Sequence, residues 1–165
     1  MVAIEAPTTP TIEDFVAMID NAWAAQEAIV RQLGPALAGG IDPGGWTARQ
    51  LLSHLIGAWQ RVPIHAGFYL DGDPATPVAF LVSDPYWISE WQTAPLTSFL
   101  LALYVAVEGN KAFLRRLDPA TFSRTRSTPF GEWSLRKLLE VSYGFHLGQF
   151  HLEQLRAFIP KGNAE

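Results

Sequence analysis

The stretch WTARQLLSHLIGAW, residues 46–59, decides the fold class because it contains both the start signal and the apolar face of an α-helix. Thr47, followed three residues later by Gln50, forms a capping box, in which reciprocal hydrogen bonds satisfy two otherwise free backbone N–H groups. Pro63, a few residues further on, is expected to kink or end this amphipathic helix. Its apolar residues recur at the three- and four-residue spacing of one helix face: Leu51, Leu52, Leu55, Ile56 and Trp59.

Three other segments show the same helical periodicity, at residues 9–34, 96–117 and about 133–158. Residues 71–94 are rich in proline, glycine and aromatic side chains, so we expect a long connection with at most a short helical turn there. Residues 123–132 are expected to form a turn or a small hairpin. Four helices joined in this way favour an all-α fold, a four-helix bundle.

The composition favours one globular domain spanning residues 1–165, because 48% of the residues are hydrophobic and 17% are charged. Twelve lysines and arginines stand against 16 acidic residues, and the net charge of −4 argues against nucleic acid as a partner. The longest apolar run, at residues 99–107, is much shorter than the roughly 20 residues of a membrane-spanning helix. The N-terminus lacks the pattern of a signal peptide, so we expect a cytoplasmic protein that does not enter a membrane.

Histidines are the main candidates for chemistry, since the chain has no cysteine and any metal would need histidine or carboxylate ligands. His54 lies at the edge of the apolar face of the second helix, about 110° from its centre. His146 and His151 are five residues apart, which places them about 140° apart around a regular α-helix. Metal-binding pairs on one helix are usually four residues apart. The spacing alone therefore leaves open whether these two side chains share a site.

Aromatic residues are concentrated between the end of the second helix and the long connection. Large aromatic side chains with polar atoms commonly line concave ligand sites, although many of these residues will belong to the core. We therefore expect a pocket for a small-molecule ligand, covered by residues 71–94. The aromatic set comprises Trp59, Phe68, Tyr69, Phe80, Tyr86, Trp87 and Trp91.

Two parts of the sequence resemble the DinB-like superfamily of four-helix bundles. GGWTARQLLSHLIGAWQ, residues 44–60, is similar to its helix-two signature, in which a Trp-Ser/Thr start leads to a leucine pair and a histidine. GEWSLRKLL, residues 131–139, followed by HLGQFHLEQL, residues 146–155, is similar to its helix-four signature, with two histidines and a Leu-x-Gln-Ile/Leu tail. The stretch HLIGAWQ also resembles the ClbS/DfsB branch. The resemblance extends over essentially the whole chain.

The resemblance implies an up-down-down-up bundle with a divalent metal held by three histidines, one on helix two and two on helix four. Carried over by position, His54 and His151 match two ligands, whereas the third falls on Leu147. His146 is one residue away and reaches the metal if helix four contains a one-residue π-bulge. Aligned on HLGQ instead, His146 becomes the last ligand and Ser142 falls where a histidine is expected. The candidate ligands are therefore His54, His146 and His151, unless the bundle has lost one ligand.

Two functions follow from this resemblance. In the first, three neutral imidazoles hold Zn, Ni or Fe(II), and the protein is a metal-dependent hydrolase or a low-molecular-weight-thiol transferase. In the second, it is a non-catalytic small-molecule-binding or protective bundle of the ClbS/DfsB type, with a degenerate metal site. The sequence assigns neither a thiol cofactor nor catalytic residues. A structural or interaction protein is a third class, and because such bundles pair through helix faces, we expect a homodimer.

Overall fold

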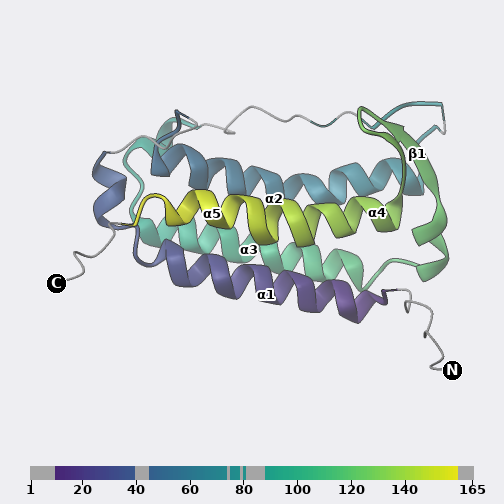
Figure 1. The fold of residues 1–165 in the computed structure, drawn as a ribbon, viewed down its shortest axis with the longest axis horizontal. Helices are drawn as coiled ribbons and strands as arrows, with labels where there is room; N and C mark the ends of the chain where they lie inside the picture. Colours follow the sequence, from purple (N-terminus) through teal and green to yellow (C-terminus); the bar gives the residue numbers. More distant parts are fainter. Residues whose placement is uncertain (1–9, 40–44, 74, 79, 81–87, 160–165) are drawn as a thin grey trace, which may run out of the picture.

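The computed structural model describes residues 10–39, 45–73, 75–78, 80 and 88–159. The described helices form four long rods. They lie side by side along the longest axis of the molecule (Figure 1). Three of them are α1 (Ile12–Val30), α2 (Ala48–Leu70) and α3 (Leu96–Leu114). The fourth rod consists of three consecutive parts, α4 (Leu135–Leu139), η4 (Glu140–Phe150) and α5 (His151–Arg156). The prediction of an all-α four-helix bundle is confirmed.

The four rods follow the up-down-down-up order that the resemblance implied. In Figure 1, α1 and the fourth rod run in one direction, while α2 and α3 run in the other. α1 packs against α3 and against η4, and α2 packs against α3 and the fourth rod. Because α2 and α3 are parallel neighbours, the chain must return along the whole bundle between them. This explains why the connection after residue 70 is long.

Where the structure describes the connections, they contain three short helical turns and one β-hairpin. The turns are η1 (Pro35–Ala38), η2 (Ser89–Gln92) and η3 (Pro119–Ser123). The hairpin pairs β1 (Thr125–Thr128) with β2 (Gly131–Ser134) in antiparallel register. The expected hairpin before the last helix is therefore confirmed. In the described part of the long connection, η2 is the one helical turn, in line with the expectation of at most a short turn.

Two arginines from the hairpin region bind the C-terminal end of α2. Arg124 donates from Nη1 to the carbonyl oxygen of Leu70 at 2.7 Å. Arg126 donates from Nε to the carbonyl oxygen of Phe68 and from Nη2 to that of Gly72, both at 2.9 Å. The last carbonyls of a helix lack N–H partners and carry partial negative charge, so these bonds are favourable. They fix the hairpin against the end of α2.

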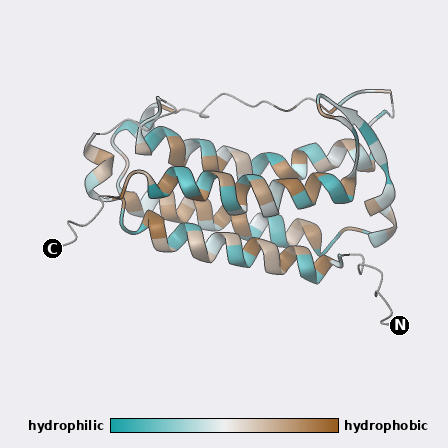
Figure 2. Ribbon diagram, viewed as in Figure 1, coloured by the Kyte–Doolittle hydropathy of each residue, from teal (hydrophilic) through white to brown (hydrophobic). Residues whose placement is uncertain are grey.

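The hydrophobic core fills the space between the four rods. Figure 2 shows hydrophobic residues recurring among hydrophilic ones along each helix, as expected where each rod buries one face. The capping box predicted for Thr47 and Gln50 is present, and Thr11 forms a second one with Asp14 at the start of α1. The largest fully buried side chains include Phe15, Trp59, Tyr69, Phe99 and Tyr143.

α2 continues through Pro63 to Leu70, so the alternative that this proline ends the helix is wrong. Proline has no backbone N–H, which leaves the carbonyl of Trp59 without its helical partner. Asn110 of α3 supplies the missing donor, because its Nδ2 lies 2.8 Å from that carbonyl oxygen. The same amide donates to Ala106 of its own helix at 2.7 Å and accepts from the hydroxyl of Tyr143 at 2.7 Å. A contact between helices thus replaces the local hydrogen bond.

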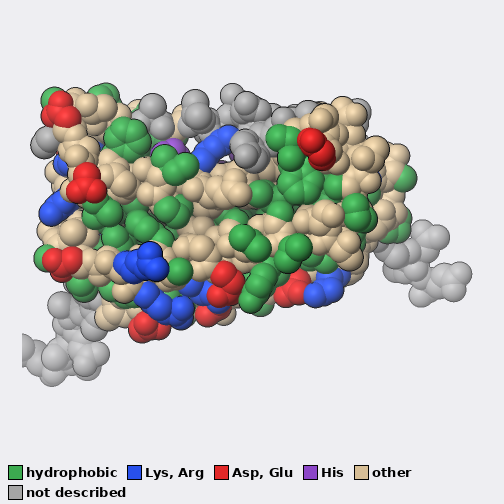
Figure 3. Space-filling view, turned by 180° about the vertical axis from the view of Figure 1, so that it is seen from behind, with side chains coloured by type: hydrophobic (Ala, Val, Ile, Leu, Met, Phe, Trp, Pro, Cys, Tyr) green, Lys and Arg blue, Asp and Glu red, His purple; other side chains and the backbone are tan. Residues whose placement is uncertain are grey.

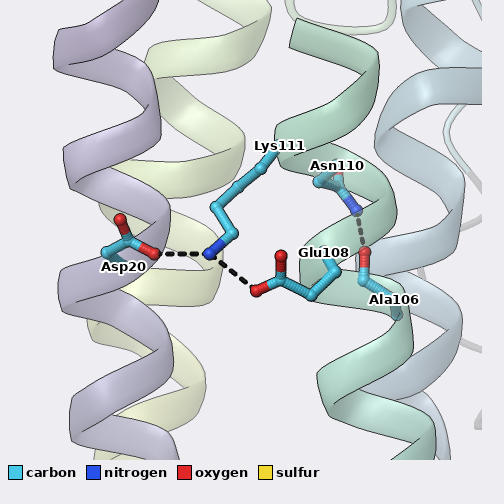
Figure 4. Close-up of polar contacts among 5 residues, drawn as sticks. All are labelled: Asp20, Ala106, Glu108, Asn110 and Lys111. Atoms are coloured by element: carbon cyan, nitrogen blue, oxygen red, sulfur yellow. Dashed lines mark hydrogen bonds and ion pairs between the residues drawn. The ribbon is translucent and has the colours of Figure 1, made fainter. Parts of the chain in front are cut away.

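Replacing Asn110 by leucine is expected to lower the free energy of unfolding by about 2–4 kcal/mol, because the Trp59 carbonyl and the Tyr143 hydroxyl lose their buried partners. Lys111→Ala is the neighbouring control. Lys111 binds Asp20 at 2.8 Å and Glu108 at 2.6 Å near the surface (Figure 4), and such pairs contribute about 1 kcal/mol or less. Urea unfolding measures both variants. Equal losses would show that the Asn110 amide has no special role.

Candidate metal centre

The structure brings His54, His146 and His151 together, although they come from two rods. His54 lies in the middle of α2, His146 lies in η4, and His151 is the first residue of α5. Nε2 of His151 is 3.1 Å from Nε2 of His54 and 2.8 Å from Nε2 of His146. One ring nitrogen from each of the three lies within 4.8 Å of the other two, which is close enough for a single metal ion. That they bind a metal remains a prediction.

A π-helix explains how histidines five residues apart reach the same point. η4 extends over Glu140–Phe150 and has the i→i+5 hydrogen bonds of a π-helix. The backbone N–H of His151 donates to the carbonyl oxygen of His146, so the five-residue spacing is the repeat of this helix. The alternative of a regular helix with the two rings pointing apart is wrong. The wide segment is also longer than the expected one-residue bulge.

Two features outside the histidines fit this wide helical segment. An added Cβ at Gly148 would lie 2.7 Å from the carbonyl oxygen of Tyr143, so the backbone there is too close for a side chain. Gln26 of α1, which is fully buried, donates from Nε2 to the carbonyl oxygen of Leu147 at 2.6 Å. Its Oε1 accepts from Trp59 Nε1 at 3.0 Å. Gln26 of α1, itself bound by Trp59 of α2, therefore fixes the backbone at Leu147, the residue next to His146.

Gln154 determines which nitrogen of His151 faces the other two rings. Its Oε1 lies 2.7 Å from Nδ1 of His151. An amide oxygen can only accept, so Nδ1 of His151 carries the proton and Nε2 presents its lone pair. This is the tautomer that a metal ligand needs. A partner on the other ring nitrogen is also the usual second contact of a metal-binding histidine.

Gln154→Leu is therefore expected to weaken metal binding by about 10- to 100-fold without removing a ligand. The loss arises because the ring of His151 is no longer held in the required tautomer and orientation. Gln154→Glu, which keeps an acceptor for Nδ1–H, should retain most of the affinity. Competition with a chromophoric zinc chelator measures both variants. Equal affinities for Gln154→Leu and the wild type would contradict this role.

Burial keeps His146 and His151 of the cluster neutral near pH 7. His54 and His151 are only 3% and 2% exposed, and His146 is partly buried. Burial, followed by the nearby His54, lowers the pKa of His146 to about 4. Burial, followed by His146, lowers the pKa of His151 to about 3 despite the opposing hydrogen bond to Gln154. Neutral imidazole is the form that binds metal.

Metal-free protein is expected to lose stability as the pH falls below about 6.5. The unfolded chain protonates its histidines near that pH, whereas the folded pKa values of His146 and His151 are about 4 and about 3. The unfolded state therefore binds more protons in this range. Stability is fully present above the unfolded pKa and declines by up to about 1.4 kcal/mol per pH unit for each histidine.

Urea unfolding of chelator-treated protein between about pH 7.5 and pH 5 tests this dependence. The variant with both His146→Gln and His151→Gln is the control, because glutamine does not titrate. Its stability should change less with pH than that of the wild type. Parallel curves for the two proteins would show that these histidines do not carry the effect.

A cavity of about 380 Å³ opens beside the histidine cluster, with His54 and His146 in its wall. Figure 3 shows the molecule from behind the view of Figure 1. On this side, a histidine and a lysine or arginine side chain lie in a hollow of the surface. α2, the fourth rod, the hairpin and Phe80 form the described walls. Most of the lining is apolar, in particular Phe80, Phe130, Trp133, Leu138, Val141 and Phe145.

The aromatic residues that the sequence singled out are only partly the ones that line the cavity. Phe80 does so, but Trp59 and Tyr69 are fully buried in the core. Trp91 stacks on Phe99 with ring centroids 4.6 Å apart, and Phe68 packs against the core. The remaining two, Tyr86 and Trp87, lie outside the described residues. The other aromatic residues of the lining are Phe130 and Trp133 of the hairpin and Phe145 of η4. The sequence did not indicate them, because the tertiary fold brings these segments to the cavity.

His65 is not part of the cluster. It also lines the cavity, where its ring packs edge-on against Phe80 at 5.0 Å. Burial, followed by the charge of Arg61, lowers the pKa of His65. The fourth histidine of the chain therefore contributes a neutral ring to the cavity wall.

The fold and the histidine cluster together define a four-helix bundle whose α2 and fourth rod carry a candidate three-histidine metal site. The chain belongs to the DinB superfamily, whose model matches residues 18–155. This family assignment confirms the resemblance seen in the sequence.

Among solved structures, the chain is similar to YfiT from Bacillus subtilis, described as a probable metal-dependent hydrolase with an unusual four-helix bundle topology. The TM-score is 0.67 at 21% sequence identity, and the match covers 96% of this chain and 89% of that chain. At this identity the likeness shows the fold alone. No curated protein sequence matches the chain. Within the described residues, no helix is long and apolar enough to cross a membrane.

Proposed function

We propose that the protein is a metal-dependent hydrolase that holds one divalent cation between His54, His146 and His151. The observation that carries the proposal is the convergence of three imidazoles beside a cavity that His54 and His146 line. Nitrogen ligands at about 2.0–2.1 Å from zinc lie roughly 2.9–3.4 Å from one another. The Nε2 separations of 2.8 and 3.1 Å are close to that range, so the residues present fit a metal.

The proton positions in the cluster also fit a cation. Because Nδ1 of His151 donates to Gln154, the lone pair on its Nε2 points toward Nε2 of His54 and of His146. Without a metal, a proton on a neighbouring ring must lie between such close nitrogens. Because the pKa values of His146 and His151 are about 4 and about 3, these rings carry no additional proton at neutral pH that would compete with a metal.

His54, His146 and His151 would hold the divalent cation, which would supply Lewis acidity and lower the pKa of a bound water molecule. Since His54 and His146 line the cavity, this chemistry would take place at its wall. The apolar walls exclude water around a bound substrate and strengthen electrostatic contacts with it. No aspartate or glutamate is present among the described residues of the lining. His65 lies 11 residues along α2 from His54, about 16 Å along the axis, and is too remote to exchange protons at the cluster.

The likeness to YfiT, described as a probable metal-dependent hydrolase, supports hydrolysis over the other chemistries. The test is a panel of small esters, amides and lactones assayed with native, chelator-treated and zinc- or nickel-reconstituted protein. We expect turnover in the native and reconstituted protein, which the chelator abolishes. Metal binding without hydrolysis, but with conjugation of a low-molecular-weight thiol to an electrophile, would instead assign a transferase. Binding of small molecules by a protein that takes up no metal would assign the non-catalytic alternative.

A further inference from the structure

The C-terminal end of η4 leaves one backbone carbonyl without a partner in its own helix. In a π-helix each N–H binds the carbonyl five residues earlier, and the last such bond joins the N–H of His151 to the carbonyl of His146. α5 begins at His151 as an α-helix, in which the partner is four residues earlier. That pattern assigns the next N–H, of Leu152, to the carbonyl of Gly148. The change of pattern therefore passes over the carbonyl of Leu147.

Gln26 supplies the donor that this carbonyl lacks. Its fully buried side-chain amide donates from Nε2 to the carbonyl oxygen of Leu147 at 2.6 Å. If η4 were a regular α-helix, the N–H of His151 would bind this carbonyl itself. A buried carbonyl without a donor costs free energy, so the amide from α1 is worth most when the helix has the π-helical pattern. Gln26 thus favours that pattern over the α-helical one.

A second hydrogen bond fixes the orientation of the Gln26 amide. Nε1 of Trp59 lies 3.0 Å from the other end of the amide. The indole N–H can only donate, so the atom that faces it must be the amide oxygen. The amide nitrogen is then the end that faces Leu147. α1 and α2 together therefore present a donor at one fixed point of η4.

The hydrogen-bond pattern of η4 determines which side chain lies beside His151. In an α-helix, residues four apart differ by about 40° around the axis and residues five apart by about 140°. In that pattern the fully buried Leu147 would share the face of His151, and His146 would be turned away. In the π-helix the ring centroids of His146 and His151 are 4.4 Å apart. A return to the α-helical pattern would therefore replace an imidazole of the cluster by an apolar side chain.

We propose that Gln26 is a positioning residue of the metal site, which keeps η4 in the π-helical pattern and thereby holds His146 beside His151. The inference rests on the proposed function in that it takes His146 as a metal ligand. Gln26 belongs neither to the histidine cluster nor to the described lining of the cavity. It acts on the site through the carbonyl of Leu147.

Gln26→Met tests the proposal, because methionine is of similar length and flexible but has no N–H donor. Tyr143→Phe is the matched control. It also removes a buried hydrogen bond of η4, from the Tyr143 hydroxyl to Asn110 Oδ1, but it leaves the donor to the Leu147 carbonyl in place. Both variants should melt at a lower temperature than the wild type. Chelator competition should show zinc binding about 10- to 100-fold weaker in Gln26→Met, and within about threefold of the wild type in Tyr143→Phe.

A second measurement reads the position of His146 without any metal. In chelator-treated protein with isotope-labelled histidine, NMR should show a nuclear Overhauser cross-peak between the rings of His146 and His151 in the wild type and in Tyr143→Phe. The cross-peak should be lost in Gln26→Met, although circular dichroism shows that the variant is still helical.

The proposal would be overturned by wild-type zinc affinity in Gln26→Met, by a retained cross-peak in that variant, or by an equal loss of affinity in Tyr143→Phe. Failure of both Gln26→Met and Gln26→Leu to fold would also overturn it, because Gln26 would then serve the fold as a whole. A wild type that takes up no zinc would count against the hydrolase assignment, whereas the metal-free cross-peak would still report whether Gln26 positions His146.

Discussion

His151→Ala is expected to weaken zinc or nickel binding by about 100-fold or more, the largest effect of any single change in the cluster. Nε2 of His151 is within 3.1 Å of both other Nε2 atoms, so this ring is the central member. It is also the ring whose tautomer is set by a partner, Gln154. Its removal leaves His54 and His146 on separate rods, without the group that contacts both.

The matched control for this variant is His65→Ala. His65 lies on α2 and lines the same cavity as His54 and His146, but it is not part of the cluster. Competition with a chromophoric chelator should therefore give wild-type metal affinity for His65→Ala. If His151→Ala retained wild-type affinity, or if His65→Ala lost as much, the metal would have to be bound elsewhere.

Gly148→Ala is expected to reduce both stability and metal affinity, although Gly148 contacts no metal. An alanine Cβ would lie 2.7 Å from the carbonyl oxygen of Tyr143, closer than such atoms approach in proteins. The backbone of η4 must shift to relieve this contact, at a cost of about 1–3 kcal/mol. That shift alters the wide turn that directs His146 toward His151, so metal binding should weaken by at least about tenfold.

Gly144→Ala provides the control within the same helical segment. A Cβ at Gly144 meets no atom within 4 Å, so alanine should leave stability unchanged or raise it by up to about 1 kcal/mol. Thermal melts and chelator competition on the two variants give the comparison. Wild-type metal affinity in Gly148→Ala would contradict the view that the π-helical geometry positions His146.

The bundle could be predicted from the sequence because its signals are local. Thr47 and Gln50 form the capping box that their spacing indicates, and the apolar stripe after them is buried. The hairpin before Leu135 also appears where turn residues indicated one. Such features depend on residues a few positions apart. Pro63 is the exception, because a donor from another helix, Asn110, compensates for the missing N–H.

The candidate site could be predicted only as a set of residues. The family resemblance selected His54, His146 and His151, but the spacing of the last two left their relative direction open. That direction depends on η4, and η4 is supported by contacts with Gln26 of α1, which is distant in the sequence. Gln26 did leave a signal, as a polar residue in the buried stripe of α1. The hydrogen-bond partner of Gln26 could not be predicted, because it is a backbone carbonyl, that of Leu147, and every residue has one.

The most direct test of the central claim is X-ray absorption spectroscopy of the protein reconstituted with zinc, together with its metal content. We predict about one zinc per chain with three imidazole nitrogens at about 2.0–2.1 Å. The signal of one imidazole should be lost in the small amount of zinc that His151→Ala retains. Less than about 0.2 zinc per chain after reconstitution, or a coordination shell of oxygen atoms without imidazole, would contradict the three-histidine site.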